Sequence, residues 1–115
     1  ITDLCVSSNG NIYGFADRNL FFVFSPQTRE IVHRENVEPN IGQTISQQGP
    51  RVFCTGSNGD IYALFARGIA TIDKDTYRIQ IIAESPAQIT GGGDILDDRI
   101  YFASGSRLYS CFLSQ

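Results

Sequence analysis

Short apolar runs alternate with polar turn residues along most of the chain. Between residues 1 and 34 these runs are rich in β-branched and aromatic types, and the breaks carry Asn, Gly, Pro, Asp or Ser. Such runs predict β-strands, and such breaks predict tight turns. This segment therefore predicts four antiparallel strands. Asn9-Gly10 favours a two-residue type I′ hairpin, because both central positions of that turn need a positive φ.

One stretch of sequence occurs three times. It reads IYGFADRNLFFVF from Ile12 to Phe24, IYALFARGIATI from Ile61 to Ile72, and IYFASGSRLYSCF from Ile100 to Phe112. The first and third copies align without a gap at a separation of 88 residues, whereas the second has lost one residue around the turn after its first apolar run. A polar connection, residues 35–50, separates the first two copies. The recurrence predicts three structural units, which we place at residues 1–39, 40–86 and 87–115.

The start of each repeated stretch is apolar at consecutive positions: IYGF, IYAL and IYFA. A strand of this kind is covered on both faces. Four-stranded sheets covered by copies of themselves, with a period of about 40 to 50 residues, are typical of a β-propeller. A two-sheet sandwich is the alternative, although its strands alternate polar and apolar residues on the outer faces. We expect an all-β fold, a partial β-propeller with two four-stranded antiparallel blades and a three-stranded last blade.

Composition narrows the choice of partners. The 115 residues form one domain at most, and 42% of them are apolar, which is enough for a core. The net charge is -3 with Lys74 as the single lysine, so no basic run is present to bind nucleic acid. No apolar run approaches the roughly 20 residues that span a bilayer, and the chain does not open on a signal-peptide pattern. We therefore expect neither a nucleic-acid partner nor a membrane span.

The chemistry-bearing residues do not form a catalytic or metal-binding motif. We expect His33, the single histidine, at the surface near the end of an outermost strand. The cysteines read as small buried thiols, because Cys5 and Cys54 occupy equivalent positions and point the same way. Asp94, Asp97 and Asp98 lack the ligand spacing of a calcium loop. The sequence therefore predicts no catalytic residue, no metal and no cofactor in this chain.

One glycine pattern and one arginine pattern remain. Gly91-Gly92-Gly93 precedes no helix, so we place it on an innermost strand where blades converge rather than in a phosphate loop. Arginine recurs in the turn between the second and third strands of each unit, and propeller turns of this kind share one face with the connections between blades. Solvated arginines are the simpler interpretation, but arginine forks also bind carboxylates. The possible anion-binding or ligand-binding rim consists of Arg18, Arg51, Arg67, Arg107, Gln43, Gln47, Gln48 and Asn40.

The run NGNIYGFADRNLFFVFSPQTREIV resembles the blades of β-propeller repeat proteins in the quinoprotein-like and WD-like superfamily, in which an "IYG" strand, an "LFVFDP" strand and a "TGEIV" strand recur. The closing RIYFASGSRLYSCFL resembles a last blade of such proteins. The Trp-Asp dipeptide of WD40 repeats is absent, as is tryptophan altogether. In such propellers the last blade commonly takes its outermost strand from the N-terminal end. The resemblance therefore implies the C-terminal part of a propeller, completed by missing blades or by another chain.

Two functions follow as hypotheses. The first is a non-catalytic scaffold or interaction segment that associates with itself or with complementary blades through its open faces. The second is part of a secreted carbohydrate-active propeller enzyme, such as a polysaccharide lyase, whose arginine rim binds an acidic carbohydrate. A propeller with a cofactor in its central channel is less well supported. The resemblance alone slightly favours an extracellular or periplasmic location, and the residues leave the compartment open.

Overall fold

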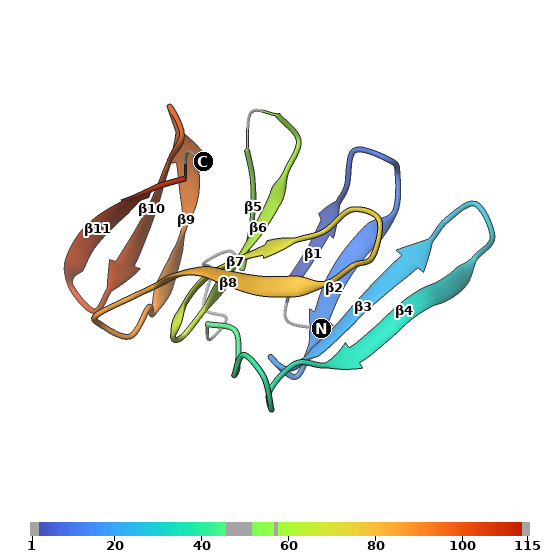
Figure 1. Ribbon diagram of the computed structural model, residues 1–115, viewed down its shortest axis with the longest axis horizontal. Helices are drawn as coiled ribbons and strands as arrows, with labels where there is room; N and C mark the ends of the chain where they lie inside the picture. Colours follow the sequence, from blue (N-terminus) through green and yellow to red (C-terminus); the bar gives the residue numbers. More distant parts are fainter. Residues whose placement is uncertain (1–2, 46–51, 57, 114–115) are drawn as a thin grey trace.

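The computed structural model describes residues 3–45, 52–56 and 58–113, and within them the regular structure consists of β-strands (Figure 1). The strands are β1 (Asp3–Val6), β2 (Ile12–Ala16), β3 (Leu20–Ser25), β4 (Glu30–Asn36), β5 (Phe53–Thr55), β6 (Ile61–Phe65), β7 (Gly68–Ile72), β8 (Ile79–Glu84), β9 (Gly91–Leu96), β10 (Arg99–Ser104) and β11 (Arg107–Phe112). They form three antiparallel sheets in chain order, which we call sheet 1 (β1 to β4), sheet 2 (β5 to β8) and sheet 3 (β9 to β11). The predicted fold class, all-β with two four-stranded blades and a three-stranded last blade, is confirmed.

The three sheets follow one another along the longest dimension of the molecule, with sheet 2 in the middle (Figure 1). Their first strands lie next to one another, since β1 contacts β5 and β5 contacts β9. The turns that join second and third strands lie on one side of the stack, the lower side in Figure 1, together with the connection between sheets 1 and 2. This arrangement makes sheet 2 the covered sheet and leaves one face of each neighbour open.

Each sheet has two faces, because successive side chains of a strand point to opposite sides. We call one the tyrosine face, after Tyr13, Tyr62 and Tyr101 at equivalent positions of β2, β6 and β10. We call the other the isoleucine face, after Ile12, Ile61 and Ile100. In each sheet the isoleucine opens the repeated stretch and the tyrosine follows it. The three tyrosines also pair with residues of the first strands, which are Cys5, Cys54 and Asp94, so the positions are equivalent.

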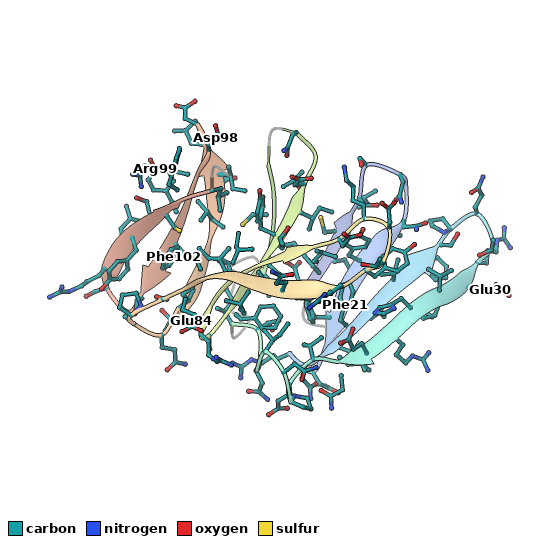
Figure 2. All side chains as sticks on the ribbon, in the orientation of Figure 1. Phe21, Glu30, Glu84, Asp98, Arg99 and Phe102 are labelled. Atoms are coloured by element: carbon teal, nitrogen blue, oxygen red, sulfur yellow. The ribbon has the colours of Figure 1, made fainter. Side chains whose placement is uncertain are left out.

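The tyrosine face of sheet 1 packs on the isoleucine face of sheet 2. The fully buried Phe15 ring stacks on Phe53, with centroids 5.3 Å apart, and meets Phe65 edge-on at 5.6 Å. Burying a phenylalanine side chain completely contributes about 1.5–3 kcal/mol. Phe21 pairs with Phe15 on the same face and has no solvent exposure (Figure 2). Aromatic packing therefore holds the first two sheets together.

The tyrosine face of sheet 2 packs on the isoleucine face of sheet 3 in the same orientation. Here a glycine allows the approach: a β-carbon added at Gly93 would lie 2.8 Å from Cδ1 of Leu64. The triple glycine thus lies on the first strand of sheet 3, as predicted, where β9 contacts β5. Gly93 is the residue at which sheet 2 comes close to this strand. Every residue of β6 is buried, as predicted for a strand covered on both faces. In β10 burial alternates instead, because the tyrosine face of sheet 3 has no neighbour among the described residues.

The turn between β1 and β2 differs from the prediction. Gly10 N–H donates to the carbonyl of Ser7 and only Gly10 of the Asn9-Gly10 pair has a positive φ, so the type I′ prediction is wrong. The side chain of Asn9 accepts a hydrogen bond from the Asn11 N–H, and this contact favours the longer turn. Two consecutive turn residues with positive φ, as a type I′ turn requires, occur at Asp97 and Asp98 in sheet 3 and also at Asp17 and Arg18 in sheet 1.

Two further details correct the sequence analysis. Phe24 pairs with Ile12, whereas Cys111 pairs with Ile100, so the third strands of sheets 1 and 3 are equivalent at 87 residues, not at the ungapped 88. His33 lies in the middle of β4 rather than near its end, half-buried between the rings of Phe21 and Tyr77.

Candidate functional site

The arginine rim was the first candidate site. Arg18 follows β2, and its Nε donates a hydrogen bond to the Thr44 carbonyl at 3.0 Å. Arg67 lies in the β6–β7 turn, and its Nη1 donates to the Ile41 carbonyl at 3.4 Å. Backbone hydrogen bonds reinforce both contacts, because the Thr44 N–H donates to Arg18 and the Ala66 N–H donates to the Gln43 carbonyl. The two arginines therefore hold the connection between sheets 1 and 2.

The other described rim residues have separate surroundings. Arg67 also lies 3.8 Å from Glu84, an exposed ion pair of small energetic value. Arg107 is the first residue of β11 and is exposed, as is Asn40. Gln43 is half-buried and contributes its carbonyl to the turn of Arg67. The remaining predicted rim residues, Arg51, Gln47 and Gln48, lie outside the described residues.

A groove of about 340 Å³ follows the first strands of the three sheets. Asp3 lies in it, but its Oδ2 accepts hydrogen bonds from the backbone N–H groups of Val52 at 2.9 Å and Phe53 at 3.1 Å. The Cys5 thiol also lines the groove, and burial raises its pKa while a contact with Thr55 partly offsets the rise. A thiol with a raised pKa is a poor nucleophile near neutral pH. The groove thus holds a structural carboxylate and an unreactive thiol.

A depression of about 590 Å³ lies beside the β7–β8 turn and is bordered by carboxylates and two basic side chains. Asp73 accepts hydrogen bonds from the N–H groups of Thr76 and Asp75, which lower the pKa of its carboxyl group. Lys74 lies 3.8 Å from Asp60, and both side chains are close to half exposed. These contacts are those of a solvated turn. Among the described residues, no three or more His, Cys, Asp or Glu side chains come together as a metal site.

His33 lies at the rim of the junction between sheets 1 and 2. Its Nε2 lies 3.2 Å from Glu35, and its ring packs against Phe21 and Tyr77. These contacts are those of a packing residue. The tyrosines behave as packing residues: Tyr13 and Tyr62 are buried in the two junctions, and burial raises the pKa of both phenols.

The outer faces of the stack are the strongest functional feature. Seven of the eight large apolar side chains that are exposed within the described part of the chain belong to the two terminal sheets, and one, Ile82, belongs to sheet 2. Sheet 1 exposes Leu4, Val6, Ile31 and Val32, and sheet 3 exposes Leu96, Leu108 and Phe112. This exposed apolar surface is the candidate interaction surface.

The register shows that each terminal sheet exposes one defined face. In sheet 3, Leu108 pairs with Ala103, and both Leu96 and Phe112 pair with Arg99, so all lie on the tyrosine face. In sheet 1, Leu4 pairs with Gly14, Val6 with Ile12 and Ile31 with Phe24, so these lie on the isoleucine face. We call these two surfaces the outer tyrosine face and the outer isoleucine face.

Equivalent residues in the interior are buried. Leu108, with 75% of its surface exposed, is equivalent by register to Phe21, which is completely buried between sheets 1 and 2. Leu4, 52% exposed, is equivalent to Phe53, which is 4% exposed in the same junction. Phe102, on the covered isoleucine face of sheet 3, lies inside the stack, whereas Glu30 and Asp98 lie at its periphery (Figure 2).

Comparison with known proteins adds no assignment: no family model and no curated protein matches this chain. In the described residues, no helix has the length and apolarity needed to cross a membrane.

Sequence reasoning anticipated open apolar faces but missed the Asp3 contact. The sequence did contain a signal for this contact: the first unit has the acidic Asp3 at the position where the second unit has the apolar Val52.

Proposed function

We propose that the chain is a non-catalytic β-propeller segment that acts as a scaffold and binds complementary blades through its two outer faces. The observation that carries this proposal is the exposure of Leu108, at a position that is buried in both other sheets. The solvent face of an antiparallel sheet usually carries polar residues. The outer tyrosine face has Asp94, Arg99 and Ser110, but it also presents Leu96, Leu108 and Phe112, each more than half exposed.

The way the interior sheets pack supports a blade as the partner. A tyrosine face packs on an isoleucine face at both junctions, so each kind of face is known to pack on the other kind. The open edge of β11 adds to this argument. β3 and β7 both pair with a fourth strand, whereas β11 pairs only with β10 among the described residues. Unpaired strand edges accept a further strand, and a complementary blade would supply one.

The experiment compares binding of a hydrophobic dye to the full chain and to three aspartate variants. We expect Leu108→Asp and Leu4→Asp each to reduce dye fluorescence, because each places a charge on an outer face. Ile82→Asp is the matched control, since Ile82 is 41% exposed but lies on the middle sheet. Circular dichroism confirms that each variant is folded. If the folded wild-type chain binds no dye and forms no complex at any concentration, the outer faces are not interaction surfaces and the proposal fails.

A further inference from the structure

Sheets 1 and 3 both pack one face on sheet 2, but they are buried to different extents. In sheet 1, the strands β2 and β3 contain three buried residues each. In sheet 3, β9 and β11 contain no buried residue, and β10 contains two, Ile100 and Phe102. The strands of sheet 3 therefore have less buried apolar contact than those of sheet 1.

Aromatic rings join sheets 1 and 2. The pairs of Phe15 lie in this junction, and Tyr77 from the β7–β8 turn packs on the ring of His33 at a centroid distance of 5.5 Å. Among the described residues, no ring pair joins sheet 2 to sheet 3, because the pair of Phe102 and Tyr109 lies within sheet 3. Ring pairs stabilise a junction beyond the area that they bury, so the first junction is the stronger one.

Polar contacts reinforce the first junction at two places. At the first strands, Asp3 accepts the N–H groups of Val52 and Phe53. Near the outer turn, the Nδ2 of Asn11 donates a hydrogen bond to the hydroxyl group of Tyr77 at 3.3 Å. Sheets 1 and 2 are therefore joined from their first strands to the β7–β8 turn.

Sheet 3 is held by packing and by the connection that precedes it. Leu64 comes close to β9 at Gly93. In the connection, residues 85–90, the Ile89 N–H donates to the Ala66 carbonyl at 3.1 Å. This bond keeps the start of sheet 3 beside sheet 2 when the rest of sheet 3 moves away.

We propose that sheet 3 opens as a separate cooperative unit while sheets 1 and 2 stay folded on each other. Proteins open locally in units of unequal stability, and units with few buried apolar contacts open most readily. Opening exposes the tyrosine face of sheet 2, where Tyr62, Leu64 and Ile69 are buried in the closed stack. The chain thereby gains an apolar surface that the closed stack hides. Both junctions are internal to the chain, so their difference does not depend on what covers the outer faces.

Hydrogen exchange measured by mass spectrometry on the full chain tests the order of opening, with β10 compared with β2. Each of these strands bonds a strand on both sides, so sheet edges do not affect the comparison. After correction for intrinsic rates, we expect the amides of β10 to exchange at least about 10-fold faster than those of β2. Equal exchange in the two strands, or faster exchange in β2, would overturn the proposal.

Asp3→Ala and Gly93→Ala then separate opening of sheet 3 from unfolding of the whole chain. Asp3→Ala weakens the first junction, so it is expected to speed exchange in β2 by about 30-fold and to leave β10 unchanged. Gly93→Ala places a β-carbon 2.8 Å from Cδ1 of Leu64, so it is expected to speed exchange in β10. It should also speed exchange in β2, because complete unfolding includes the opening of sheet 3. If Asp3→Ala speeds β10 as much as β2, or if Gly93→Ala leaves β10 unchanged, sheet 3 is not a separate unit and the proposal fails.

Discussion

Replacing Asp3 is expected to loosen the contact between the first strands of sheets 1 and 2. The Asp3 side chain lies on β1, and its Oδ2 accepts the N–H groups of Val52 and Phe53 across the junction. Val52 is completely buried and Phe53 is 4% exposed. Because β5 is the edge strand of sheet 2, these N–H groups depend on the carboxylate rather than on a neighbouring strand. Asp3→Ala removes this single acceptor from two donors.

The magnitude follows from the two hydrogen bonds and their burial. Hydrogen bonds to a charged group contribute about 1.5–3 kcal/mol, and a buried donor left without an acceptor costs about 1–3 kcal/mol. Asp3 is only half-buried, so water can replace part of what the carboxylate provides. We therefore expect Asp3→Ala to lower the free energy of unfolding by about 2 kcal/mol. Asp3→Asn keeps an acceptor without the charge and should cost about half as much.

The assay is urea unfolding of the full chain followed by tyrosine fluorescence and circular dichroism. Asp94→Ala is the matched control, because Asp94 also lies on a first strand and bonds the N–H of the next residue, as Asp3 does. The hydrogen bond of Asp94 lies within its own strand, so its loss should cost less than about 0.5 kcal/mol. All variants are compared at one protein concentration. Equal midpoints for Asp3→Ala and Asp94→Ala would refute the structural role of Asp3.

Three further perturbations test other parts of the structure. Gly68→Ala should destabilise the chain by about 1–3 kcal/mol in thermal unfolding, because the new β-carbon would lie 2.3 Å from the Ala83 carbonyl; a stability equal to that of the wild type would contradict this close approach. Arg18→Ala should lower the free energy of unfolding by about 1 kcal/mol through loss of its bond to the connection, whereas exposed Arg107→Ala should cost almost nothing, and the reverse order would contradict the structural role of Arg18. The pKa of Asp73 is lowered, so its charged form stabilises the fold above the ordinary pKa of 3.8, and that contribution is lost as the pH falls through the lowered pKa. The difference in melting temperature between wild type and Asp73→Asn should therefore shrink below that pH. A difference that stays constant with pH would refute this role of Asp73.

Much of the fold could be predicted because each level of the sequence agrees with the next. Apolar runs of strand length, separated by turn residues, gave the strands, and their recurrence gave three sheets. The errors lie where a single side chain decides the geometry. Asn9-Gly10 has the composition of a type I′ turn, yet the Asn9 side chain bonds Asn11 and lengthens it. Similarly, the ungapped alignment of the third unit hid a shorter turn before β11.

The candidate site was less predictable, since a sequence gives the position of a side chain but not its direction. Recurring arginines looked like a rim for an anion, whereas Arg18 and Arg67 turn toward carbonyls of the nearby connection. Such carbonyls carry no sequence signal, because every residue has one. Asp3 was overlooked for the same reason, as its partners are backbone N–H groups. Open apolar faces were predictable from the recurrence of the units, but the ungapped alignment makes Leu108 equivalent to Leu20, and only the strand pairing shows that it lies opposite Ala103.

The differences among the three units support a role for the outer faces beyond that of two surfaces left over from a repeat. Both outer faces keep an exposed leucine at a position that is buried in the interior: Leu4 is equivalent to Phe53, and Leu108 is equivalent to Phe21. A repeat without a partner would gain solubility from polar residues at both places. Retaining a leucine at each of them is what an interaction surface requires.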